Sequence, residues 1–275
     1  MILLVHSNRD IAGKNIAKSI LQKYPFEKTN QKYHRNPVYT AKVYGQEVAL
    51  VTLEEEAVNA QDLPELFPNP KLIVFISRHS SQSGTPTLSV HTPGNLEEAE
   101  LGGLAYTVSI SPACAMQTAL KTLSRLNQER RLCYQVSYEC THHGPSLKVP
   151  TMFVELGSSE KQWRDFAAAE IVAHAAMEAI AQAQDVSVNT AVLGIGGTHY
   201  NQKFTQMALR GEAAFGHMIP KYGLAKLDSQ ILRQCIERTQ ETVDCAILDW
   251  KGIKGEDKPN ILTILHESGL PIKKV

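Results

Sequence analysis

Short apolar runs alternate with amphipathic segments along the chain, a pattern that predicts an α/β fold. A short apolar run bounded by polar turn residues is typical of a strand in a largely buried sheet. The runs 38–44 and 47–53 flank Gly45 and Gln46 and predict a hairpin. The other predicted strands cover residues 2–6, 72–77, 87–90, 132–140, 152–156, 188–194 and 245–248.

Helical segments lie between these runs, and several begin at residues that favour a helix start. Asp10 is expected to cap one helix, and Pro112 suits the first turn of another. Ser158 and Ser159 are expected to cap a long alanine-rich helix. The predicted helices cover residues 10–23, 112–126, 158–184, 228–240 and 260–268.

Composition favours a folded chain without a membrane span. Of 275 residues, 43% are hydrophobic, and 28 basic side chains balance 28 acidic ones, which excludes disorder. The alanine-rich run 167–183 is interrupted by Glu170, His174 and Glu178, so no uninterrupted apolar stretch of about 18 residues exists. The five cysteines contain no CxxC pair and are expected to be free thiols. We expect a cytoplasmic protein with a single domain over residues 1–275 and a possible insertion or lid near 78–108.

The net charge of zero conceals an uneven distribution. Residues 1–45 carry eight basic side chains and two acidic ones, whereas residues 46–103 carry nine acidic and two basic ones. Ordinary solvated surface is one interpretation. The other is a basic face that meets a phosphate backbone. The lysines proposed for that face are Lys14, Lys18, Lys23 and Lys28.

Histidines collect in polar segments that follow predicted strands. These histidines are His79, His91, the tandem pair His142 and His143, and His199. Because open α/β sheets place their sites at the carboxyl ends of strands, we expect these side chains to share one site. In an extended segment His142 and His143 would point opposite ways, so at most one should face the substrate.

Two kinds of chemistry remain open for this histidine set. Histidine serves at neutral pH either as an acid–base group or as a metal ligand. A metal site could draw on His79, His91, one of the tandem pair, preferably His142, and His199, with Glu139 or Glu155 nearby. The run 194–197 fits no dinucleotide-binding pattern, which argues against a dinucleotide cofactor. Backbone N–H groups of Gly196, Gly197 and Thr198 could still receive an oxyanion, and His217 and Lys221 lie in a further polar turn where Lys221 could meet a phosphate.

The same polar segments carry a family resemblance. They are residues 77–81 (SRHSS), 90–95 (VHTPGN), 139–146 (ECTHHGPS), 153–158 (FVELGS), 196–200 (GGTHY) and 215–222 (FGHMIPKY). In these segments and their order, the chain resembles the archaeal and plant type of D-aminoacyl-tRNA deacylase. Cys140 and Ser146 stand where relatives more often have valine and threonine.

The resemblance implies a fold, a reaction and a cofactor. The fold would be a three-layer α/β/α sandwich with a mixed, mostly parallel sheet, similar to peptidyl-tRNA hydrolase and phosphorylase-like folds. The reaction would be hydrolysis of the ester that joins a D-amino acid to the 3′ end of tRNA. The cofactor would be zinc, and the partner would be D-aminoacyl-tRNA, bound by a protein expected to be a monomer.

The substrate suggests how the site would work. We expect His142 or His143, or a metal they help to hold, to activate water that Glu139 orients, with the oxyanion near Gly196, Gly197 and Thr198. Two alternatives come from other classes. One is a metal-dependent peptidase or amidohydrolase that acts on small substrates, and the other is an RNA-binding module without catalysis.

Overall fold

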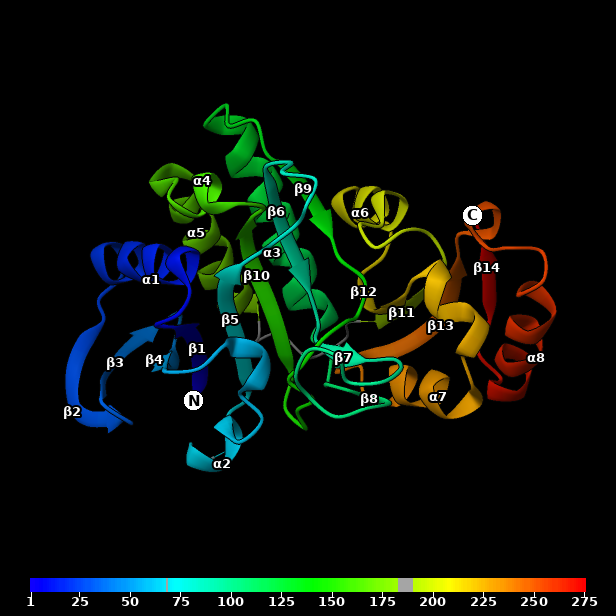
Figure 1. The fold of residues 1–275 in the computed structure, drawn as a ribbon, viewed down its shortest axis with the longest axis horizontal. Coiled ribbons are helices and arrows are strands. Elements are labelled where there is room, and N and C mark those ends of the chain that lie inside the picture. The colour runs from blue at the N-terminus through cyan, green and yellow to red at the C-terminus, as the bar shows by residue number, and fades with distance from the viewer. Residues whose placement is uncertain (68, 183–189) are drawn as a thin grey trace.

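A mixed sheet of eight strands forms the larger half of the molecule (Figure 1). The structure, a computed structural model, describes residues 1–67, 69–182 and 190–275. The strand order is β2-β3-β4-β1-β5-β10-β6-β9. Strand β1 pairs in parallel with β4 and β5, and β5 pairs in parallel with β10. The strands are β1 (Ile2–Ser7), β2 (Glu27–Tyr33), β3 (Asn36–Val43), β4 (Gln46–Leu53), β5 (Leu72–Arg78), β6 (Thr87–His91), β9 (Gln135–Tyr138) and β10 (Thr151–Gly157).

Both faces of this sheet are covered, because alternate residues of its central strands are apolar on each side. Leu4, Val74 and Val154 pack on one side with helices α1 (Ile11–Lys23), α3 (Ala113–Glu129) and α5 (Phe166–Gln182). Val5 and Phe75 pack on the other side, under the short helices η1 (Ala57–Asn59) and α2 (Leu63–Leu66). The predicted α/β class with a mixed, mostly parallel sheet is confirmed.

A second, smaller sheet continues the fold toward the C-terminus, in yellow to red in Figure 1. Its order is β12-β11-β13-β14, and every pairing in it is parallel. Its strands are β11 (Thr190–Ile195), β12 (Phe215–Ile219), β13 (Thr242–Leu248) and β14 (Ile272–Lys274), and the helices of this half are α6 (Gln202–Leu209), α7 (Ser229–Glu237) and α8 (Lys258–Ser268). Phe204, Phe215 and Met218 join the core of the large sheet, so the two halves share apolar packing. The single-domain organisation stays a prediction.

The prediction of one helix over residues 158–184 is wrong, because a helix ends at Trp163 and a second one begins at Phe166. Ser159 begins only the short helix α4 (Glu160–Trp163), in a capping box with Gln162. Asp165 Oδ1 then accepts the backbone N–H groups of Ala167 and Ala168 at 2.9 and 3.1 Å, which starts α5 at Phe166. The predicted end of that helix at Gln184 and the start of a strand at Val188 lie outside the described residues.

Part of the segment 78–108 is built into the large sheet. Strand β6 pairs antiparallel with β10 and parallel with β9. The short antiparallel pair β7 (Gly94–Asn95) and β8 (Thr107–Val108) follows, and the loop 96–106 joins its two strands. The insertion or lid near 78–108 stays a prediction. None of the helices described has the length and apolar character that a bilayer crossing requires.

His6 gives the fold a pH dependence that can be measured. It is buried at the end of β1, where Nε2 shares a 2.9 Å hydrogen bond with Thr52 Oγ1. Burial lowers the pKa of His6 from 6.5 to about 4. Since the folded pKa lies below the unfolded one, the stability that His6 contributes is present at pH 7 and is lost as the pH falls from 6.5 toward 4.

We therefore expect the wild-type protein to lose about 2 kcal/mol more of its unfolding free energy between pH 7 and pH 5 than His6→Gln does. Urea unfolding at the two pH values measures this difference. Equal losses in the two proteins would show that His6 is not desolvated as described.

Candidate active site

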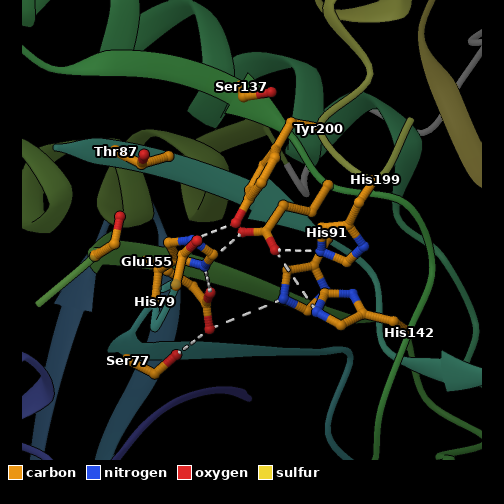
Figure 2. A network of polar contacts seen from close by, with 12 residues as sticks. Ser77, His79, Thr87, His91, Ser137, His142, Glu155, His199 and Tyr200 are labelled. Atoms are coloured by element: carbon orange, nitrogen blue, oxygen red, sulfur yellow. Dashed lines mark hydrogen bonds and ion pairs between the residues drawn. The ribbon is translucent and has the colours of Figure 1, made fainter. Parts of the chain in front are cut away.

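A cluster of histidines and carboxylates lies where the two sheets meet (Figure 2). It borders a cavity of about 440 Å³. Figure 2 shows the labelled rings and Glu155 directed toward one another. The cluster consists of His79 after β5, His91 at the end of β6, Glu139, His142 and His143 after β9, Glu155 in β10, and His199 and Tyr200 after β11.

Strand register explains the convergence. Glu155 of β10 pairs with Ser77 of β5 on one side and with Ser89 of β6 on the other. His79 and His199 follow parallel strands, as the strand-end argument requires. His91 ends an antiparallel strand, and its place in the cluster comes from its pairing with Phe153 instead.

Glu139 is the centre of the cluster. Its carboxylate is 1% exposed and accepts a 2.9 Å hydrogen bond from His199 Nε2 at Oε2. His142 Nε2 lies 3.6 Å from the same oxygen, and His79 Nδ1 lies 3.1 Å from Oε1 without hydrogen-bond geometry. Burial alone would raise the pKa of Glu139, but the hydrogen bond from His199 and the positive charge of His79 hold it well below its usual range. Glu139 is therefore an ionised carboxylate.

Glu155 and His79 form a buried ion pair behind Glu139. Ser77 Oγ donates to Glu155 Oε1 at 2.7 Å, and His79 Nδ1 lies 3.6 Å from Oε2. Burial opposes both charges, but His79 and His91 lower the pKa of Glu155 to about 2, and the two carboxylates raise the pKa of His79 to about 11. His79 Nε2 is 2.8 Å from the Tyr200 hydroxyl, so both ring nitrogens of His79 are engaged.

Three imidazoles are anchored at Nδ1 by the backbone. The Nδ1 atoms of His91, His142 and His143 lie 3.3, 2.8 and 2.7 Å from backbone carbonyl oxygens, and since a carbonyl only accepts, each Nδ1 carries a proton. Burial lowers the pKa of His142 and His143, so these two rings are neutral and keep the lone pair on Nε2. Against the effect of burial, Glu155 raises the pKa of His91, whose Nε2 lies 3.8 Å from Glu155 Oε1. This is the arrangement by which proteins orient metal-binding histidines.

Both tandem histidines enter the cluster, which corrects the expectation that only one would face the site. The His142–His143, His91–His142 and His91–His143 ring centroids are 4.3, 4.3 and 4.8 Å apart. The segment is not extended, because His143 has a left-handed φ of 44°. The Thr141 N–H donates to Met218 O at 3.0 Å and the Gly144 N–H to Leu101 O at 2.9 Å, which anchors this turn.

The structure groups the possible metal ligands into overlapping sets. One ligand atom from each member lies within 4.8 Å of the others in each set. His142 belongs to two of these sets. The metal site predicted from the sequence placed His79, His91, His142 and His199 in a single set instead. The sets found among the described residues are His91–His142–His143, Glu139–His142–His199 and His79–Glu139–Glu155.

Other predicted site residues lie beside the cluster rather than in it. The Gly196 N–H donates to Ile219 O at 2.8 Å, and Thr198 Oγ1 donates to Tyr200 O at 3.0 Å. Lys221 is exposed and its N–H donates to Gly197 O. His217 is fully buried, where Nδ1 contacts Thr141 Oγ1 and Nε2 contacts Arg238 O, each at 3.1 Å. Burial lowers the pKa of His217 to about 4, so its place in the fold is that of a neutral anchor for Thr141.

The four lysines expected to meet phosphate are exposed on α1 and β2. Lys23 lies 3.2 Å from Glu170, and Lys18 lies 5.5 Å from the centre of the Phe166 ring. Lys14 follows Asp10, which caps α1 and also lines the cavity. Lys28 lies on β2, at the edge of the large sheet.

Several residues of the site have contacts that were not predicted from the sequence. Glu155 was only an optional ligand, although a lone carboxylate within the apolar strand 151–157 is itself a signal. Tyr222 lies 3.0 Å from His199 Nδ1, and Phe153 stacks on His91 at 5.0 Å. Both lie in segments that carry the family resemblance, 153–158 and 215–222, but their contacts with the histidines depend on how the sheets pack.

The comparison with known proteins identifies a family. Residues 66–273 match the family model described as D-aminoacyl-tRNA deacylase. The chain belongs to the D-aminoacyl-tRNA deacylase family. Relatives so named are 37% identical over 276 residues in Thermococcus kodakarensis, covering 98% of each chain, and 35% identical over 280 residues in Pyrococcus abyssi, covering 100% of each. A crystal structure of a conserved protein of unknown function superposes with a TM-score of 0.88 at 30% identity, covering 100% of this chain and 95% of that one. The family resemblance seen in the sequence is confirmed.

Proposed function

We propose that this chain hydrolyses the ester bond of D-aminoacyl-tRNA and releases free D-amino acid and tRNA. The observation that supports it is the Glu139-centred cluster, which opens into a cavity in a chain that aligns along its full length with relatives named for this activity. Family membership favours this function over a metallohydrolase of small substrates. A monomeric state and a cytoplasmic location belong to the same proposal.

We further propose that Glu139, His142 and His199 hold a zinc ion. Two histidines and a glutamate are a known ligand set for catalytic zinc, and these three line the cavity. Glu139 Oε1 and His91 Nε2 are buried without a hydrogen-bond partner among the described residues, so the cluster has polar capacity to spare. Zinc there would act as a Lewis acid and lower the pKa of a bound water.

Each proposed ligand is held from behind by a partner of its own. His142 Nδ1 donates to Cys140 O, and His199 Nδ1 contacts the Tyr222 hydroxyl, which can either donate or accept. Glu139 is backed by His79. The chain therefore fixes the orientation of the three side chains before substrate enters.

Two further side chains supply the proton chemistry of ester cleavage. His143 lines the cavity with its Nδ1–H bound to Gly144 O, so its Nε2 can accept a proton from the attacking water. The Tyr200 hydroxyl accepts from His79 Nε2–H, which leaves its own proton for the oxyanion or the departing ribose oxygen. The Gly196 N–H, one of the donors predicted for the oxyanion, is already engaged with Ile219 O.

The proposed reaction is tested by its products. Purified protein given D-tyrosyl-tRNA should yield free D-tyrosine and tRNA that can be charged again. Peptide and amide substrates of similar size should remain intact. Cleavage of the small substrates with no effect on the tRNA ester would instead favour the metallohydrolase alternative.

Leu101 offers a prediction about substrate selection. It is 57% exposed and lies on the wall shared by the catalytic cavity and a neighbouring cavity of about 410 Å³. An apolar side chain in this place should contact the aminoacyl group. Leu101→Ala should therefore lower kcat/KM about tenfold more for D-tyrosyl-tRNA than for D-alanyl-tRNA.

Leu104→Ala is the matched control for this measurement. Leu104 belongs to the same loop and is 52% exposed, but it is not among the described residues that line the two cavities. The control should leave both substrates unchanged. A Leu101 variant with equal effects on the two esters would remove this residue from substrate selection.

A further inference from the structure

The carboxyl ends of the second sheet form a row that includes His199 of the active site. Because all four strands are parallel, their carboxyl ends lie along one edge. At a spacing of about 4.8 Å per strand, that edge is roughly 15 Å long. In sheet order, the residues that follow or end the strands are Lys221 after β12, Gly197 to His199 after β11, Trp250 and Lys251 after β13, and Lys274 at the end of β14.

Direct contacts connect neighbouring members of this row. The Lys221 N–H donates to Gly197 O at 2.9 Å. A Cβ atom on Gly252 would lie 3.1 Å from Gly197 N, so the turn after β13 packs against the turn that carries His199. The Trp250 N–H donates to Val275 O at 3.2 Å, which ties β14 to the same edge. The turn that carries His199 is therefore in contact with the turns on both sides of it in the row.

This edge presents unpaired positive charge around one indole ring. The Nζ atoms of Lys274 and Lys258 lie 3.8 and 4.4 Å from the centre of the Trp250 ring. Cation–π attraction holds both ammonium groups in place. Lys221, Lys251 and Lys274 are exposed, and these lysines and Lys258 form no ion pair with an acidic residue that the structure describes. Asp249, the acidic residue that directly follows β13, is paired with Lys203.

The neighbouring cavity of about 410 Å³ has the reverse charge. This cavity shares His142, His143 and Leu101 with the site and is lined by Glu97, Glu98 and Glu100, of which Glu97 alone forms an ion pair with a residue that the structure describes, Lys226. A phosphate backbone leaving the site would be repelled on that side. It would be attracted along the edge of the second sheet.

We infer that Lys221, Lys251, Lys258 and Lys274 bind the phosphates of the tRNA acceptor end and direct its 3′ ester into the catalytic cavity, with Trp250 as the positioning residue of Lys258 and Lys274. This surface is distinct from the lysines of α1 and β2, and the inference rests on the proposed function. Each ammonium group that meets a phosphate releases a counterion, so binding there must weaken as salt rises.

The test compares two triple variants with the same loss of charge. One is Lys251→Gln with Lys258→Gln and Lys274→Gln. The control is Lys42→Gln with Lys71→Gln and Lys121→Gln, at exposed lysines outside this edge. KM for D-tyrosyl-tRNA and its salt dependence are measured for both, and D-tyrosyl-adenosine serves as an ester without phosphates.

The edge variant should raise KM for the tRNA ester about tenfold or more and reduce the slope of log(kcat/KM) against log salt by about 2. It should cleave D-tyrosyl-adenosine at the wild-type rate, and the control should match wild type on both esters. An edge variant with wild-type KM and salt slope would overturn the inference and leave the proposed function standing. Equal losses on D-tyrosyl-adenosine would also overturn it, since the defect would then lie in the catalytic cluster. A wild-type protein that cleaves neither ester would instead contradict the proposed function.

Discussion

Glu139→Gln should reduce hydrolysis of D-aminoacyl-tRNA by about 10³-fold, within the 10²–10⁴ range for loss of a positioned acid–base group. The substitution keeps the shape of the side chain but removes the charge that His79, His142 and His199 surround. It therefore disturbs the proposed zinc ligands and the orientation of water together. KM should change little, because Glu139 is only 1% exposed and offers substrate little contact surface.

The control is Glu170→Gln on α5, a carboxylate that pairs with Lys23 and Arg130 away from the cavity. It should retain wild-type kcat. Circular dichroism of both variants should match wild type, because His79 keeps Glu155 as its partner when Glu139 is neutralised. A Glu139→Gln enzyme that is folded and fully active would remove Glu139 from the mechanism.

Metal removal is expected to have the second large effect. Chelation should strip bound zinc and lower activity at least about 10²-fold, and added zinc should restore it. The metal content of purified protein, measured by elemental mass spectrometry, should fall in His142→Ala and in His199→Ala because each loses a proposed ligand.

His174→Ala is the matched histidine control. His174 lies on α5, where Nδ1 contacts the Tyr24 hydroxyl at 2.8 Å, and it is not a member of the ligand sets found among the described residues. It should keep its zinc. Full activity in protein shown to be free of metal, or unchanged zinc in both ligand variants, would contradict the assignment.

Sequence patterns predicted those helices and strands that depend on residues close together in the chain. Asp10 caps α1 as expected, and its side chain accepts the Gly13 N–H at 2.9 Å. The hairpin of β3 and β4 and the buried strands β1, β5 and β10 follow directly from their apolar runs. Asp165 shows the limit of such patterns, because the break before α5 depends on one polar side chain inside an alanine-rich stretch.

The site was only partly predictable, because some of its residues are placed by contacts between segments that are far apart in the sequence. His79 and His199 follow parallel strands, so the strand-end rule applies to them. His91 ends an antiparallel strand, and the left-handed turn at His143 brings in a second tandem ring, so neither position follows from that rule. The second sheet was not anticipated, and with it the contact of Tyr222 with His199 could not be expected.

The central claim is that this cluster cleaves the ester of a D-amino acid on tRNA. The most direct measurement compares initial rates on D-tyrosyl-tRNA and L-tyrosyl-tRNA, with one protein preparation and matched tRNA. The account predicts that the D ester is cleaved at least about 10²-fold faster than the L ester. Equal rates on the two esters, or cleavage of neither, would contradict it.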